Sequence, residues 1–171
     1  MGNIVVACGL QKSYIKPEGS CYLGASLCDF EPKWLSFLKE RKSKGEKIFF
    51  TREIHNSDQG FYKAQKTHSL VGTVDIDIPE VYKPYIDYII NVNRFNAFYE
   101  TCLGSEIYKL KPREVTIIGV ETHTNILFTA EEFRNRGLDV TVIESLTTAS
   151  DDYLHALGVT LMSNVLSVNI S

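Results

Sequence analysis

One stretch decides the fold, and it reads EVTIIGVETHTNILFTAEEF over residues 114–133. Residues 114–120 are mostly apolar and β-branched, which is typical of a strand that is buried on both faces. Apolar residues then recur at the spacing of one helical face until Gly137 ends the pattern. We therefore predict a strand, a tight turn and a helix from about His123 to Asn135.

The rest of the chain repeats this alternation of strand and helix on both sides of the central stretch. Further strands are predicted at residues 4–8, 47–51, 88–92, 139–143 and 165–169, and further helices at about 31–45, 101–110 and 150–162. Neither a linker nor an internal repeat interrupts this order, so we expect residues 1–171 to form a single domain. Its class is α/β, with one doubly wound, mostly parallel sheet and helices on both faces in a Rossmann-like arrangement. Ligands of such sheets bind beyond the carboxyl ends of the strands.

The composition excludes several classes of function. The 171 residues are 44% hydrophobic and carry a formal net charge of -3. No basic stripe interleaves with aromatic residues, so we expect no nucleic-acid partner. No apolar run approaches the ~20 residues that cross a bilayer, and the first residues do not resemble a cleavable signal, so we expect a cytoplasmic protein without a membrane contact. The four cysteines contain no C-x-x-C pair, which favours reduced thiols over disulfides or structural zinc.

Five segments match, in order, the motifs of a known superfamily. They are Gly9–Gln11, Thr51–His55, His68–Thr73, Arg94–Phe98 and Gly119–Ala130. The last resembles the strand-to-helix signature of the isochorismatase-like hydrolases, which include nicotinamidases and related cysteine amidohydrolases. The others resemble that superfamily's Asp-x-Gln after the first strand, its metal-ligand segment, its His-Cys-x-x-Gly-Thr motif and the stretch after its catalytic lysine. The resemblance covers nearly the whole chain and implies the same α/β fold.

The resemblance also marks the positions of a catalytic triad, and all three hold other residues. The cysteine nucleophile, the aspartate and the lysine of the family correspond to Asn125, Gly9 and Val92. These residues supply neither a nucleophile, nor a proton-exchanging group, nor a positive charge. The resemblance therefore implies a degenerate triad without the ordinary amidase mechanism. Isochorismatases can work without the cysteine, but they keep the aspartate as acid and base, and Gly9 removes it.

The turn after residues 114–120 could keep a backbone role without the thiol. In the family a cis peptide between non-proline residues precedes the helix, and here it corresponds to Val120-Glu121. The N–H groups of Glu121 and Asn125 would then line an oxyanion position. Four residues would surround a bound ligand, namely Glu121, Asn125, Gly9 and Val92. In the alternative, Thr122 or Thr124 caps the helix and the pocket is collapsed.

Three residues match a nicotinamidase-like metal site, namely Glu53, His55 and His68. Glutamate stands where the family usually has aspartate, and Phe61 stands where another histidine would be. A carboxylate and two imidazoles can bind zinc or iron, with water in the remaining positions. The alternative is that the histidines are satisfied by ordinary core or solvent contacts. No other cofactor is expected.

Cys8 lies one residue before Gly9, so a shifted alignment would make it a relocated nucleophile. Side chains alternate along a strand, however, so Cys8 should point away from the site, where a thiol behaves as a small core residue. Aromatic residues are also dense between residues 82 and 99. They could line a pocket, a subunit interface or the core.

Together these observations favour a catalytically inactive pseudoenzyme that binds a small ligand or a protein partner. The resemblance implies a homo-oligomer, and a hetero-oligomer with a related subunit is a further alternative. Two other functions stay open. One is an active hydrolase of a small amide that uses a metal-bound water or unfamiliar residues, and the other is a structural subunit of an assembly.

Overall fold

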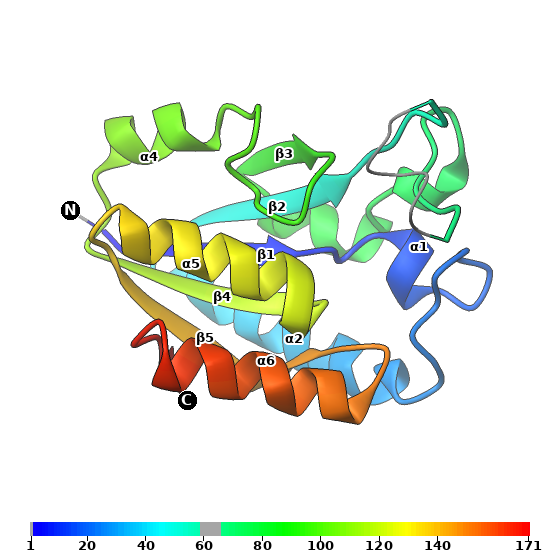
Figure 1. The fold of residues 1–171 in the computed structure, drawn as a ribbon. Coiled ribbons are helices and arrows are strands. Elements are labelled where there is room, and N and C mark those ends of the chain that lie inside the picture. The colour runs from blue at the N-terminus through cyan, green and yellow to red at the C-terminus, as the bar shows by residue number, and fades with distance from the viewer. Residues whose placement is uncertain (1, 59–65) are drawn as a thin grey trace.

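A six-stranded sheet forms the centre of the protein (Figure 1), in a computed structural model that describes residues 2–58 and 66–171. The strands are β1 (Ile4–Cys8), β2 (Lys47–Glu53), β3 (Tyr88–Val92), β4 (Glu114–Val120), β5 (Asp139–Thr148) and β6 (Asn169–Ile170). Their order is β3-β2-β1-β4-β5-β6, and each neighbouring pair is parallel. The structure confirms the predicted doubly wound α/β fold, and the sheet is parallel throughout.

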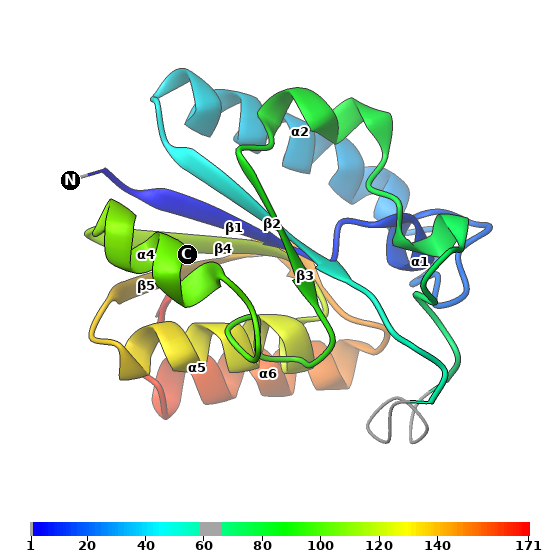
Figure 2. The same ribbon diagram turned by 90° about the horizontal axis from the view of Figure 1, so that it is seen from above.

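Helices cover both faces of this sheet (Figure 2). They are α1 (Lys12–Ile15), α2 (Leu27–Ser43), α4 (Leu103–Leu110), α5 (Leu127–Asn135) and α6 (Asp152–Asn164), with short 3-10 helices at Val74–Ile76 and Glu80–Tyr85 and a π-helical turn at Thr122–Ile126. Figure 2 shows α2 on one face and α4, α5 and α6 on the other. Within residues 2–58 and 66–171, no helix combines the length and the apolar character needed to cross a bilayer.

Each face of the sheet has its own apolar core. Because successive residues of a strand point to opposite faces, Val5 and Val6 of β1 belong to different cores. Val6 lies in the core that contains Phe133 of α5, and Val5 lies in the core that contains Trp34 of α2. All four side chains are fully buried. Burial on both faces explains why the strands read as continuous apolar runs in the sequence.

The strand order reverses between β1 and β4, and this switch point positions the candidate site. Cys8 at the end of β1 pairs with Thr51 of β2 and with Gly119 of β4, so three strands end at one edge of the sheet. Gly119 has a φ of +114°, and a Cβ atom there would lie 2.1 Å from the carbonyl oxygen of Cys8. Only glycine permits this approach of β1 and β4.

Two predicted boundaries shift because backbone bonds extend the elements. α2 begins at Leu27 rather than at residue 31, and Pro32 lies inside it. Its first turn is held by bonds to residues three positions earlier, such as the one from the Leu27 N–H to Gly24. β5 continues to Thr148 rather than ending at residue 143, because it pairs with β4 again beyond a register shift.

The strand predicted at residues 165–169 is wrong over most of its length. The N–H groups of Leu166 and Val168 donate to carbonyls of Leu161 and Met162, so this segment closes the end of α6 instead of pairing with β5. Only Asn169–Ile170 forms a strand. The apolar residues of this segment resemble those of a buried strand, but its backbone N–H groups already form the hydrogen bonds that end α6.

Cys8 lies in the core on the α5 face and is fully buried. Burial raises the pKa of its thiol to about 12, against a weaker opposing hydrogen bond with Thr51. The prediction that Cys8 is a core residue is confirmed, and a shifted alignment that makes it a nucleophile has no support.

Candidate functional site

The turn after β4 has the predicted backbone. The Val120-Glu121 peptide is cis, and the chain then enters the π-helical turn that leads into α5. The N–H of Ile126 donates to the Glu121 carbonyl at 3.1 Å, which leaves a wide first turn. No side chain of the described residues caps this turn or α5, so capping by Thr122 or Thr124 is wrong. The Thr122 hydroxyl instead contacts Nδ1 of His155 in α6 at 2.8 Å.

Helix α6 also approaches the turn through its backbone. A Cβ atom on Gly158 would lie 2.9 Å from Cα of His123 and 3.0 Å from the carbonyl oxygen of Thr122. A larger residue at this position would therefore push α6 away from the turn. The position of α6 and the shape of the turn are thus linked by direct contact.

Gly9 lies against the turn and has no room for a side chain. Its φ is +64°, and a Cβ atom would lie 2.7 Å from the Val120 carbonyl oxygen and 2.9 Å from Cγ2 of the same residue. The Gly9 N–H donates to Oγ1 of Thr51 at 3.2 Å, which fixes the backbone in this position. The structure therefore brings Gly9 and the cis turn into contact, as the switch-point argument predicts.

Val92 and Asn125 are both buried, but in different surroundings. Val92 lies in the apolar core with Ile126, and it pairs with Glu53 in the β2–β3 ladder. Asn125 lies on the π-helical turn, and its amide forms no hydrogen bond with any side chain or carbonyl of the described residues. The ligand-binding role of these two residues stays a prediction.

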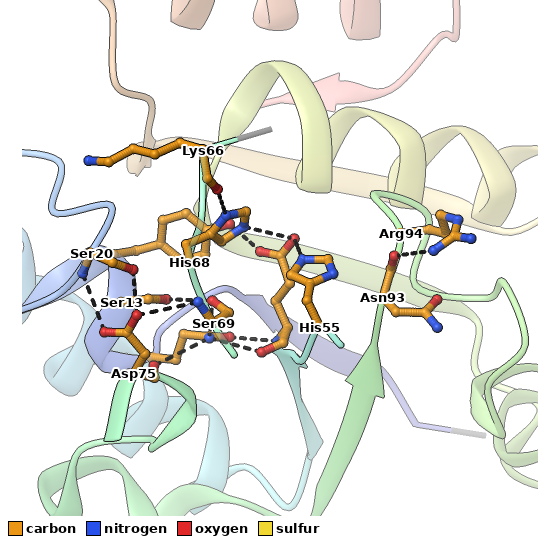
Figure 3. A network of polar contacts seen from close by, with 12 residues as sticks. Ser13, Ser20, His55, Lys66, His68, Ser69, Asp75, Asn93 and Arg94 are labelled. Atoms are coloured by element: carbon orange, nitrogen blue, oxygen red, sulfur yellow. Dashed lines mark hydrogen bonds and ion pairs between the residues drawn. The ribbon is translucent and has the colours of Figure 1, made fainter. Parts of the chain in front are cut away.

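Glu53, His55 and His68 form one buried cluster, as predicted. One oxygen of Glu53, Oε1, lies 2.8 Å from Nε2 of His55 and 3.4 Å from Nε2 of His68. The candidate ligand atoms of the three residues all lie within 4.8 Å of one another. Figure 3 shows the rings of His55 and His68 close together above the end of the sheet, and their centroids are 5.0 Å apart. Phe61 lies outside the described residues.

A polar network holds the Glu53 end of β2 in place. The Gln11 side chain accepts from the Glu53 N–H at 2.6 Å and donates to the Glu53 carbonyl at 3.1 Å and to Oγ of Ser69 at 3.0 Å. Ser69 in turn donates to Ser13, and its N–H donates to Asp75 (Figure 3). The side chain of Gln11 thus ties the strand end to the loop that carries His68.

The charges in the cluster are arranged to keep Glu53 ionised. Burial alone would raise the pKa of Glu53, but hydrogen bonds with His55, His68 and Tyr14 outweigh it and lower the pKa to about 2. Burial of His68 would lower its pKa, but the contacts with the Glu53 carboxylate outweigh this effect and raise the pKa. The Tyr14 hydroxyl donates to Oε2 of Glu53, and burial together with the Glu53 charge raises the pKa of Tyr14 well above its usual value.

This donor set fits zinc or iron. Nδ1 of His68 lies 2.6 Å from the Lys66 carbonyl oxygen, so we assign the Nδ1 proton to this bond. Nε2 faces Glu53, and it would bind a metal ion once it has lost its own proton. A backbone carbonyl behind a histidine ligand is a usual support for metal binding. Both Nε2 atoms and one carboxylate oxygen converge on one point, which suits a cation that prefers nitrogen and oxygen ligands. A cavity of about 520 Å³ adjoins the cluster at His55.

The Glu121 carboxylate is a site residue whose side chain the sequence argument did not use. Its Oε2 lies 3.4 Å from Oγ of Ser150 and 3.5 Å from Nε2 of His123. Burial raises the pKa of Glu121, the hydrogen bond from Ser150 opposes this, and the Glu53 charge raises it further. A signal was present, because a carboxylate directly after the buried β4 strand must lie at the switch point.

The fold and the turn define the class of this protein. A parallel sheet in this order, with a non-proline cis bond where β4 meets α5, is the architecture expected for the isochorismatase-like hydrolases. The chain belongs to this family, because residues 4–171 match the family described as "Isochorismatase domain". YaaI of Bacillus subtilis, an uncharacterized isochorismatase family protein, is 29% identical over 85 residues, which are 50% of this chain and 47% of that protein. The match thus spans about half the length of this relative.

Solved structures of amidases share the fold over nearly their whole length. The pyrazinamidase/nicotinamidase of Streptococcus mutans superposes with a TM-score of 0.90 at 19% identity, covering 99% of this chain and 100% of that one. Nicotinamidase PncA of Bacillus subtilis gives 0.91 at 16% identity, with coverage of 100% and 99%. The pyrazinamidase of Pyrococcus horikoshii, solved in complex with zinc, gives 0.86 at 18% identity, with coverage of 100% and 99%.

Proposed function

We propose that this chain is a member of the isochorismatase family that lacks cysteine amidase activity and binds a small ligand at the cis turn, beside a buried metal ion. The observation that carries the proposal is the lack of room for a side chain at Gly9. A Cβ atom there would lie 2.7 Å from the Val120 carbonyl oxygen and 2.9 Å from Cγ2 of Val120, which is too close for a side chain. This backbone therefore has no place for the family's aspartate, whatever rotamer it takes.

The other two positions support the same conclusion. Val92 lies in the apolar core, where it offers no charge to stabilise a thiolate. Asn125 stands at the nucleophile position and has no group that attacks a carbonyl. Because members of a catalytic triad act as a unit, replacement of any one of them by the family residue should leave the protein inactive.

Ligand binding does not need these side chains. The cis turn precedes a helix whose first N–H groups have no side-chain cap, and such groups bind carbonyl or carboxylate oxygens. The half-buried carboxylate of Glu121 adds a hydrogen-bond acceptor at the same place. Glu53, His55 and His68 would hold a zinc or iron ion nearby, and this ion would supply Lewis acidity when bound.

Ammonia release tests the loss of activity. Purified protein, incubated with nicotinamide or pyrazinamide, should release no more ammonia than a buffer blank, and the Asn125→Cys variant should behave in the same way. Calorimetric titration with the two amides and their acids tests the binding. Binding of one of them with a stoichiometry near one, lost in Asn125→Trp, is the expected result. Turnover above the blank, or no binding by any of the four compounds, would contradict the corresponding half of the proposal.

A metal-dependent hydrolase is the second candidate, and the donor set favours it. Two histidines and one glutamate are a set that catalytic zinc sites use, because it leaves a coordination position open. Ammonia release that requires added zinc and is lost in His55→Ala would favour this candidate. Zinc binding without turnover would favour the first.

A further inference from the structure

The last 19 residues, Tyr153–Ser171, contain no Asp, Glu, Lys or Arg. In a chain with 23% charged residues, roughly four would be expected over this length. The segment nevertheless includes nearly all of α6, which lies at the outside of the molecule in front of the sheet (Figure 1). An exposed helix whose one Asp, Glu, Lys or Arg residue is Asp152 at its start is unusual for a surface that faces only water.

The exposed residues of α6 form a continuous apolar stripe. Tyr153, Leu157 and Leu161 follow one another at intervals of four, so they lie on one side of the helix, and Val165 continues the row past its end. Tyr153 is 73% exposed and Val165 is 68% exposed. The opposite side of the same helix packs inward through Met162, which is fully buried. The residues of the stripe are therefore different from those that hold α6 on the sheet.

The stripe continues onto α5 through Phe128. This ring is exposed and stacks on Phe95 at 5.8 Å between centroids. A hollow of about 350 Å³ lies between the two helices, and Leu127, Phe128, Glu131, Leu161, Val165 and Leu166 line it. We call the surface formed by Tyr153, Leu157, Leu161, Val165 and Phe128 the α5–α6 apolar face.

We propose that the α5–α6 apolar face binds the same face of a second copy of this chain, with the two α6 helices antiparallel across a twofold axis. All five side chains are exposed, from 37% for Leu161 to 73% for Tyr153, so the face offers a row of large apolar side chains for the centre of an interface that buries ~800 Å² on each partner. A contiguous apolar patch on a protein surface often marks an interaction site.

Charge supports a second copy in this orientation. Exposed Asp152 lies at the start of α6, and Arg134 lies beside its end, where its Nε donates to the Leu166 carbonyl at 3.2 Å. Within its own chain Arg134 forms a long ion pair, at 3.6 Å, with the exposed Asp139. An antiparallel pairing places the acidic start of one helix beside Arg134 of the other copy, twice in the same interface. A lipid surface would instead favour lysines along the edge of the stripe, and α6 has none.

Analytical ultracentrifugation of the full chain over a range of concentrations tests the proposal. The wild-type protein should be a dimer at about 50 micromolar, and Val165→Glu and Tyr153→Glu should each weaken dimerisation by at least about tenfold. Tyr108→Glu is the matched control, because Tyr108 is 77% exposed on α4, away from the face, and this variant should stay dimeric. Tyr153 and Val165 are largely exposed, so both glutamate variants should fold normally, and circular dichroism checks this.

A cross-link tests the antiparallel arrangement independently. In a background with exposed Cys28 and Cys102 replaced by serine, Leu157→Cys lies near the middle of α6 and should form a disulfide with its copy on mild oxidation. Tyr108→Cys in the same background should not. A wild-type protein that stays monomeric at the same concentration would overturn the proposal, as would a dimer that neither glutamate variant weakens. Failure of Leu157→Cys to cross-link in a dimer that the glutamate variants do weaken would overturn the antiparallel arrangement.

Discussion

The two halves of the candidate site differ in what they keep. At the end of β2, Glu53, His55 and His68 contact one another, and Gln11 and Tyr14 support them, so this corner keeps a connected set of candidate metal ligands. At the ends of β1 and β4, the backbone has the cis turn of the family, but Gly9 and Asn125 carry no reactive group. The comparison teaches that backbone geometry and side-chain chemistry can change separately within one site.

The largest effect is expected from breaking this set of candidate metal ligands. Glu53→Ala removes the carboxylate that His55, His68 and Tyr14 contact, and it should destabilise the protein by about 4 kcal/mol, because it leaves buried polar groups without their charged partner. Urea unfolding of chelator-treated protein measures this. Elemental analysis should also show that bound zinc or iron is lost.

Glu80→Ala is the matched control for this variant. The Glu80 side chain is 83% exposed and pairs with Lys83 at the surface, so its removal should change the stability by no more than about 0.5 kcal/mol. A Glu53→Ala protein as stable as this control would show that the corner is not held together as we describe.

The next effect concerns the incomplete half. Gly9→Asp should destabilise the protein by about 3 kcal/mol, because the new side chain meets Val120 and must adopt a positive φ. Gly72→Asp is the control, since its φ is +81° but no atom lies within 4 Å of its Cβ position. That variant should lose only about 1 kcal/mol. Thermal or urea unfolding measures the loss of stability in each variant. Equal losses would show that the contact with Val120 does not exclude a side chain at Gly9.

A smaller effect is expected from pH. The folded-state pKa of His68 is raised, so its contribution to the stability of the metal-free protein is present below about pH 6.5 and is lost as the pH rises through the raised pKa. The pKa of Glu53 is lowered to about 2, so its contribution is present above about pH 4.3 and is lost as the pH falls through the lowered pKa. Chelator-treated protein should therefore be most stable between these two limits, and His68→Gln should flatten the upper side of the profile. Zinc affinity should rise with pH, because zinc must displace the His68 proton. An upper side that His68→Gln leaves unchanged would contradict the assignment.

The smallest effect compares single thiols. Cys8 is buried with a pKa of about 12, whereas Cys28 and Cys102 are exposed. A thiol reagent at pH 8 should modify the two exposed residues in the folded protein and reach Cys8 only after unfolding. Mass mapping of the modified peptides distinguishes them. Rapid labelling of Cys8 would reopen its interpretation as a nucleophile.

The elements that could be predicted are those whose pattern is local. Residues 114–135 were correctly read as a strand, a turn and a helix, because burial on both faces of β4 and the one-sided pattern of α5 are visible in the sequence. The sequence did not show α1 or the 3-10 helix at Glu80–Tyr85, since both are short and depend on packing. α1 packs against the 3-10 helix at Val74–Ile76, and the helix at Glu80–Tyr85 packs against α2. The strand predicted at residues 165–169 is wrong, because the N–H groups of this segment form the hydrogen bonds at the end of α6.

The candidate site could be predicted only through the resemblance. The spacing of His55 and His68 does not show that His68 lies beside Glu53. Tyr14, which also contacts Glu53, lies far from all three in the sequence. The cis bond at Val120-Glu121 is confirmed, and so is the grouping of the three candidate metal ligands. The carboxylate of Glu121 was missed because the argument treated this residue only as a backbone donor.

The close contact at Gly9 also bears on descent. A single base change converts a glycine codon into an aspartate codon, so an acid at this position is genetically near. Structurally it is distant, because the first side-chain carbon would lie 2.7 Å from the Val120 carbonyl oxygen and the backbone has a conformation that aspartate rarely adopts. A lineage carrying this protein would need a second substitution that moves the turn before the first could survive selection. The same glycine that leaves the turn intact thus closes the shortest mutational route to an acid beside it.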